Sequence, residues 1–160
     1  MAVKGNSFFY ESVTRDPRRT FESVALAVTS SLVMGLGLML VGTVTPQVWL
    51  VGALVWAGAV LGLGAGLITF LGPVSGGGAT YTQVARGLGY AVVPQTLAFL
   101  PVANFMPGFV IGSIWAGYCS MVAVREAHHI PTRNAVILVA VPVLLAIGAM
   151  PIVLLVTGSG

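Results

Sequence analysis

Two long uncharged apolar runs occupy the first half of the chain and constrain its fold more than any other feature. Residues 24–44 and 48–71 contain no Asp, Glu, Lys or Arg, and only Thr45-Pro46-Gln47 separates them. A helix needs about 20 apolar residues to cross the hydrocarbon core of a bilayer. Because lipid offers no hydrogen bonds, a spanning segment must satisfy its backbone internally, as a helix does. The two runs therefore predict two transmembrane helices.

Composition supports lipid as the solvent. Hydrophobic residues make up 57% of the 160 residues and charged residues 7%, whereas soluble domains have about 25% charged residues. A soluble fold with so few charges could not cover its surface. The excess of seven Lys/Arg over four Asp/Glu is too scattered for the basic face that nucleic-acid binding requires, so we expect no nucleic-acid partner.

Three further apolar segments follow, at residues 84–100, 107–124 and 135–156. The Gly-rich loop 72–83, the Pro-rich turn 101–108 and the polar stretch 125–134 separate them, and Pro142 predicts a kink in the last one. We therefore predict an all-α polytopic membrane protein. Residues 1–22 form a cytoplasmic or interfacial segment, and residues 23–160 form a bundle of five transmembrane helices.

The positions of the basic residues support this count. Lys/Arg in short loops favour the cytoplasmic side of a membrane. Five spans place every Lys and Arg on one side, whereas four spans break the pattern. We therefore expect the N-terminus inside and the C-terminus outside. The seven residues are Lys4, Arg15, Arg18, Arg19, Arg86, Arg125 and Arg133.

The N-terminal segment combines aromatic and charged residues. We expect an interfacial stretch to about Thr14, with the aromatic residues 8–10 at headgroup level and the nearby arginines against anionic lipid headgroups. Asp16 before Pro17 is a good helix start, because its side chain can cap the helix and proline suits the first turn.

The third predicted span begins with the unusual stretch ARGLGYAVVPQ, residues 85–95. Arg86 would lie at the cytoplasmic end and extend to the headgroups. Gln95 would lie about 13 Å deeper, near the bilayer centre, where its amide needs a partner and should face other helices. The partners we considered are carbonyls freed by Pro94, the Tyr118 hydroxyl, or a ligand.

Small residues recur at four-residue spacing in three spans. Such ridges let helices approach closely in lipid. We favour packing within the chain, with Gly62 at the centre of one packed ridge; docking of a partner protein on one ridge is the alternative. The ridges are Ala27, Ser31 and Gly35; Gly58, Gly62 and Gly66; and Gly108, Gly112, Ala116 and Ser120.

No residue is predicted to be catalytic, to bind a cofactor or to ligate a metal. His128 and His129 are adjacent, lack metal-ligand spacing and are interpreted as loop histidines. The glycines of residues 75–80 lack a preceding strand and a following Gly-Lys-Ser/Thr, so a flexible loop is favoured over a phosphate loop. Cys119 is interpreted as an inert packing residue rather than a nucleophile paired with His128.

Ionisable residues near the predicted cytoplasmic face allow two readings. Arg86, Arg125 and Glu126 could bind a lipid headgroup or a partner. Alternatively, Arg86 and Glu126 neutralise each other, and we favour this structural reading because charges at the interface cost less than charges at the bilayer centre.

The order of these features resembles the Yip family, the Ypt/Rab-interacting-protein domain, in its short bacterial-type form. The most specific pieces are Arg86, Gly89, Tyr90, Ala91 and Pro94, together with the hinge of residues 126–135. The resemblance covers about residues 10–155. It implies a five-helix membrane domain with a cytoplasmic N-terminus, and a location in the inner membrane of a bacterial cell. Eukaryotic members are associated with small GTPases and vesicle traffic, but this chain lacks their long cytosolic N-terminal arm, which argues against GTPase binding.

We therefore expect a non-enzymatic scaffold or accessory subunit that binds another membrane protein or itself. A small oligomeric permease or lipid-handling protein is the alternative. No acid/base pair or metal cluster points to an enzyme, and no Asp, Glu, Lys or His lies within a predicted span, which argues against an ion-coupled transporter.

Overall fold

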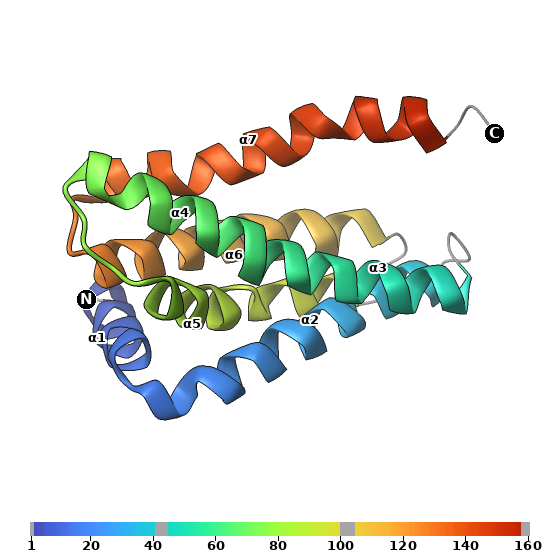
Figure 1. Ribbon diagram of the computed structural model, residues 1–160. Coiled ribbons are helices and arrows are strands. Elements are labelled where there is room, and N and C mark those ends of the chain that lie inside the picture. The colour runs from blue at the N-terminus through green and yellow to red at the C-terminus, as the bar shows by residue number, and fades with distance from the viewer. Residues whose placement is uncertain (1, 41–44, 100–104, 158–160) are drawn as a thin grey trace.

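Figure 1 shows the computed structural model of the protein, which describes residues 2–40, 45–99 and 105–157. Every regular element in these ranges is a helix, and they contain no strand. The prediction of an all-helical fold is therefore confirmed for the described part of the chain. The elements are α1 (Ala2–Arg15), the 3-10 turn η1 (Pro17–Arg19), α2 (Thr20–Leu40), α3 (Pro46–Gly58), the π-helical segment η2 (Ala59–Gly64), α4 (Ala65–Leu71), the 3-10 turn η3 (Gly72–Ser75), α5 (Tyr81–Ala91), the 3-10 segment η4 (Val93–Phe99), α6 (Phe105–His128) and α7 (Thr132–Thr157).

The long elements run roughly side by side, in alternating directions (Figure 1). From α1, the chain runs along α2, returns through α3, η2 and α4, and turns again into α5 and η4. It returns along α6 and then runs away from α1 along α7. The shorter α1 lies across one end of this bundle, against α5 and α6.

Three helical stretches of the described chain are long and apolar enough to cross a membrane: Pro17–Gly37, Pro46–Ser75 and Pro107–His128. Within α7, the stretch Thr132–Leu145 is also apolar. These helices support an integral membrane protein, but by length and composition they do not confirm the predicted count of five.

The predicted third span is where the structure differs most. Instead of one α-helix over 84–100, α5 ends at Ala91 and the 3-10 segment η4 follows. Proline provides no backbone N–H, and its ring disfavours α-helical geometry in the residue before it, so Pro94 ends the helix. The chain continues through 3-10 turns, in which the Gln95 backbone N–H donates to the Val92 carbonyl.

The N-terminal segment, predicted as an interfacial stretch, is helical. Residues 2–15 form α1, and Asp16 separates it from η1 and α2 by accepting a hydrogen bond from the Arg18 backbone N–H. This is the helix start predicted from Asp16-Pro17. One face of α1 is buried against the bundle, with Tyr10, Val13 and Thr14 almost inaccessible to solvent.

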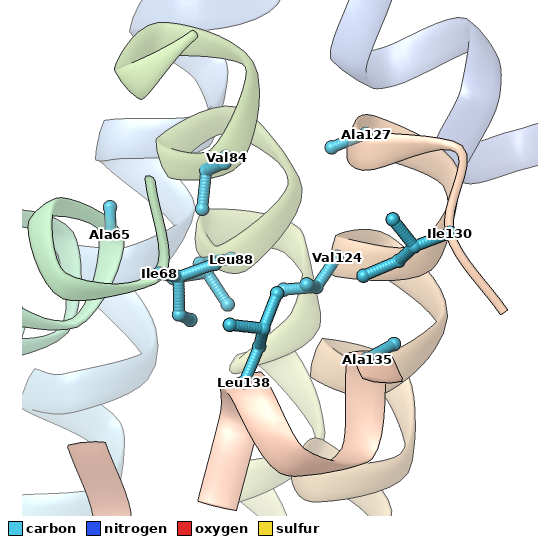
Figure 2. Close-up of a cluster of buried hydrophobic side chains, with 9 residues drawn as sticks. All are labelled: Ala65, Ile68, Val84, Leu88, Val124, Ala127, Ile130, Ala135 and Leu138. Atoms are coloured by element: carbon cyan, nitrogen blue, oxygen red, sulfur yellow. The ribbon is translucent and has the colours of Figure 1, made fainter. Parts of the chain in front are cut away.

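Near the α1 end, α4, α5, α6 and α7 bury a common apolar cluster (Figure 2). The cluster joins segments far apart in the sequence, and the exclusion of its side chains from solvent and lipid defines how the four helices pack. Its members are Ala65, Ile68, Val84, Leu88, Val124, Ala127, Ile130, Ala135 and Leu138.

Helix α5 approaches its neighbours very closely at its glycines. A Cβ on Gly89 would lie 2.1 Å from the Ser23 hydroxyl of α2, and a Cβ on Gly87 would lie 3.0 Å from the Ala123 Cβ of α6. The Ser23 hydroxyl reaches the α5 carbonyls of Ala85 and Arg86, at 3.2 and 3.0 Å. These glycines therefore let α5 pack closely against α2 and α6.

Two of the three predicted small-residue ridges pack within the chain. On α2, Ala27 and Ser31 are buried, and a Cβ on Gly35 would lie 2.6 Å from the Trp49 ring. On α6, Ala116 is buried, and a Cβ on Gly112 would lie 2.7 Å from the Pro94 carbonyl oxygen.

The third ridge does not pack, and the prediction that Gly62 lies at a packed centre is wrong. A Cβ on Gly58, Gly62 or Gly66 would meet no atom within 4 Å. The same helical stretch buries its alanines Ala53, Ala57 and Ala65 and also Ile68. Burying an alanine side chain hides more apolar surface than burying a glycine does. The helical stretch therefore turns its alanines inward, and the glycine row lies on the outer face.

The π-helical segment has a local cause of stability. A π-turn changes the backbone hydrogen bonding of a helix and is often found where function or packing requires it. Here the Tyr81 hydroxyl, at the start of α5, donates to the Leu61 carbonyl at 2.7 Å. This contact ties the π-helical segment to α5.

Candidate functional site at the charged end

The basic residues gather at one end of the bundle. Lys4 and Arg15 belong to α1, two arginines to η1, and the others to α5, the end of α6 and the start of α7. Figure 1 shows that α1, the start of α5, the end of α6 and the start of α7 lie together at the end of the bundle marked N. We call this region the charged end, and it is the candidate functional site.

Arg86 is buried within the charged end. Only 5% of the residue is exposed. Its Nε donates to the Thr82 carbonyl at 3.0 Å, one turn earlier in α5, and its buried Nη1 has no hydrogen-bond partner. The sequence predicted that this side chain would extend to the headgroups. In the structure it is buried instead.

The predicted neutralisation of Arg86 by Glu126 is wrong, because Glu126 pairs with its neighbour. Arg125 Nη2 lies 2.5 Å and Nε 2.9 Å from Glu126 Oε1. The same guanidinium donates to the Ser7 hydroxyl of α1 and, at 3.4 Å, to the Thr132 hydroxyl of α7. This half-buried group links the end of α6 to its two neighbours.

A second arginine contact joins α1 to the turn after α6. Arg15 Nη2 lies 3.1 Å from Glu11 Oε1 and 3.3 Å from His129 Nε2. His129 has a φ of 55°, the left-handed geometry that commonly ends helices. It is exposed, in agreement with its interpretation as a loop histidine.

His128 is not a loop histidine, since it is the last residue of α6 and only 3% exposed. Its ring occupies the concave side of the Gly-rich loop, where Cβ atoms on Gly72 and Gly77 would lie 2.2 and 2.5 Å from it. The Ala79 backbone N–H donates to Nδ1 at 3.3 Å. Because Nδ1 accepts this bond, a neutral ring bears its proton on Nε2, which is buried without a partner.

Cys119 and His128 lie in different surroundings. Cys119 packs with Tyr10, Val13, Tyr90 and Val122 in a second buried cluster, separate from the glycine loop around His128. Burial raises the pKa of the Tyr10 phenol above its ordinary value, with a smaller contribution from Cys119. Within the described ranges no group of three or more His, Cys, Asp or Glu is arranged to hold a metal ion.

Gln95 has a partner that the sequence did not suggest. The Trp56 indole N–H of α3 donates to Gln95 Oε1 at 3.2 Å. The expectation that Gln95 faces another helix is confirmed, but its partner is neither Tyr118 nor a backbone carbonyl. The sequence did not indicate Trp56 as the donor, because the pairing depends on where η4 places Gln95.

The apolar helices and the charged end together define an integral membrane protein of the all-helical class. The chain belongs to the Yip1 domain family, whose family model matches residues 6–155. This match confirms the resemblance seen in the sequence, and the family is one of membrane proteins. No curated protein matches the chain, and no solved structure matches it either.

Proposed function

We propose that the protein is a non-enzymatic membrane scaffold or accessory subunit that binds another membrane protein through Gly58, Gly62 and Gly66. The observation behind this proposal is that all three positions are open in the described part of the chain. The other two ridges already pack against helices of the same chain, so this one is available to a partner helix.

The physical reason lies in how helices associate in lipid. Apolar side chains gain little by leaving lipid for a protein surface, so association depends on close packing, which glycine and other small residues allow. The outer face of this helical stretch carries the three open glycines beside larger exposed residues such as Leu63 and Phe70. A partner helix with its own small residues would fit it.

The orientation proposed with this function is N-terminus inside and C-terminus outside, with five crossings of a bacterial inner membrane. Two features support it. All Lys and Arg belong to the charged end, as the positive-inside rule requires of a cytoplasmic face. Also, α5 and η4 continue in the same direction despite the break between them, and both pack against α2 and α6.

Native co-purification in mild detergent tests the proposed function. Full-length protein should bring down a larger membrane protein in fixed stoichiometry, and Gly62→Leu should remove most of that partner while leaving the protein folded. Gly117→Leu is the matched control, because Gly117 on α6 is equally open but lies on another helix.

The outcomes separate the two candidate functions. Loss of the partner with Gly62→Leu alone supports the scaffold. A homo-oligomer that retains a lipid or solute, with no other protein bound, would instead favour a permease or lipid-handling protein. Equal loss with Gly62→Leu and Gly117→Leu would show that the glycine ridge is not the docking surface.

A further inference from the structure

Arg86 has no counter-charge in the described part of the protein. The chain has four acidic residues. Three of them pair with other arginines: Glu11, Asp16 and Glu126. The fourth, Glu22, is exposed at the start of α2 and forms no ion pair with Arg86.

An uncompensated buried guanidinium requires explanation. Arginine stays protonated in proteins, so Arg86 cannot become neutral to relieve its burial. A buried charge is retained at reasonable cost only when it is paired and hydrogen-bonded. Nε donates to the Thr82 carbonyl, but Nη1 is buried without an acceptor in the described part of the chain. An anion supplied from outside the chain would provide both the charge and the acceptor.

A second buried donor lies on the same face of α5. Tyr90 follows Arg86 by four residues, which makes the two side chains neighbours on the helix surface. Tyr90 is 8% exposed, and its buried hydroxyl makes no hydrogen bond of good geometry, although the Glu22 and Arg19 side chains are close enough to act on it. Helix α1 packs against Tyr90 on this face, and the Phe9 ring lies edge-on against the Tyr90 ring at 5.6 Å.

We propose that Arg86 and Tyr90 bind a phosphate-bearing anion beneath α1, with the Arg86 guanidinium supplying the charge and the Tyr90 hydroxyl a second donor. The planar guanidinium suits phosphate oxygens better than a lysine ammonium does, and hydrogen bonds between charged groups are the strong ones. The phosphate belongs either to an anionic lipid headgroup or to a free phosphate. This inference does not depend on the scaffold role.

The charged residues around the site predict how its affinity for the anion should change when they are substituted. Glu22 and Arg19 are the charged side chains that act on the Tyr90 hydroxyl, and the Glu22 carboxylate competes with an anion as its acceptor. Arg19 would attract the anion and Glu22 would repel it. Removal of the Glu22 charge should therefore strengthen binding, whereas loss of the Tyr90 hydroxyl should weaken it.

Thermal unfolding of the full chain in a non-ionic detergent tests the site, with tryptophan fluorescence as the readout. The two probes are dihexanoyl phosphatidylglycerol and inorganic phosphate, titrated separately at constant ionic strength. The unfolding temperature of the wild type should rise to a plateau with one probe, because a ligand that binds only the folded state stabilises it. A rise with phosphatidylglycerol alone identifies a lipid headgroup, and a rise with inorganic phosphate identifies the free anion.

Arg86→Met should abolish this rise and, without ligand, unfold at the same or a higher temperature than the wild type, because it removes an unpaired buried charge. Arg133→Met is the control: Arg133 is exposed at the start of α7, and its loss should leave the rise intact. A purely structural role for Arg86 predicts instead that Arg86→Met lowers the unfolding temperature with and without ligand.

Two milder variants keep the test decisive if Arg86→Met does not fold. Tyr90→Phe should raise the half-saturating concentration about tenfold, the effect of one hydrogen bond to a charged group, and Glu22→Gln should lower it. The proposal is overturned if neither probe stabilises the wild type. It is equally overturned if the folded variants, Arg86→Met included where it folds, respond as the wild type does.

Discussion

A Cβ on Gly72 would lie 2.2 Å from Cε1 of His128, so the Gly-rich loop can close over the end of α6 only because Gly72 has no side chain. Gly77 approaches the same ring from the other end of the loop, and Ala79 completes the contact through its backbone N–H. Gly72 and Gly77 thus leave the space that the buried His128 ring occupies.

The effect of an added methyl group on stability should therefore depend on which glycine of the loop receives it. Gly77→Ala should destabilise the protein by about 1–3 kcal/mol, the usual cost of overpacking a filled site, because its Cβ would lie 2.5 Å from His128 Nδ1. Gly78→Ala is the matched control, since a Cβ there meets nothing within 4 Å. Denaturant unfolding in detergent would compare the two variants. Equal stabilities would show that the loop does not depend on the close contact between Gly77 and His128.

Helical glycines should divide by their surroundings in the same way. Gly89→Ala places a Cβ 2.1 Å from the Ser23 hydroxyl and 2.4 Å from its carbonyl oxygen, so it should separate α5 from α2 and destabilise by more than about 1 kcal/mol. Gly62→Ala meets no obstacle and should be neutral or stabilising by up to about 1 kcal/mol, through helix propensity.

Thermal unfolding of both variants without any partner checks this contrast. A marked loss of stability in Gly62→Ala would mean that the Gly58–Gly62–Gly66 face packs within the chain after all. An unaffected Gly89→Ala would mean that α5 and α2 are further apart than described.

The contact between Trp56 and Gln95 should contribute modestly. Polar contacts between membrane helices are worth about 0.6 kcal/mol on average, and at most about 2, so Gln95→Leu should lower stability by that order without unfolding the bundle. In a Trp56→Phe background the same change should cost less, because the indole donor is already gone. Strictly additive effects in this double-mutant cycle would show that the two side chains do not interact.

Accessibility labelling tests the proposed topology. In a Cys119→Ala background, single cysteines at Ser7, Ser75 and His129 should react only from the cytoplasmic side. Cysteines at Asn104 and Ser159, two positions outside the described residues, should react only from the opposite side. Labelling of Ser159 from the cytoplasm would reduce the number of crossings to an even one.

Several features were predictable from local sequence because their physical causes are local. Uncharged runs of spanning length predict membrane helices, and Asp16 before Pro17 predicts a helix start, since capping involves only neighbouring residues. The break in the third segment was less accessible. Pro94 predicts a bend, but whether the chain resumes an α-helix or continues as 3-10 turns depends on the neighbours α2 and α6, against which η4 packs.

The candidate site was only partly predictable. The sequence singles out Arg86 as unusual, but it suggested Glu126 as its counter-charge, whereas Arg125 is closer to Glu126 in both sequence and space. Tyr90 gave no signal as a donor, since a tyrosine in an apolar segment usually buries its ring and pairs its hydroxyl. Its missing partner is visible only once α1 is in place.

The sequence by itself determined the solvent, the helical class, the Yip1 family and the gathering of basic residues at one end, because these depend on composition, run length and order along the chain. The tertiary structure decided which small-residue ridges are packed, where Gln95 finds its partner and which arginine is buried without an ion pair. Glycine ridges look alike in a sequence, and only the relative rotation of the helices turned two of them inward and left Gly62 outside. Arg86, likewise, is an ordinary interfacial arginine until α1, α2 and α6 close around α5 and bury it away from the acidic side chains of the chain.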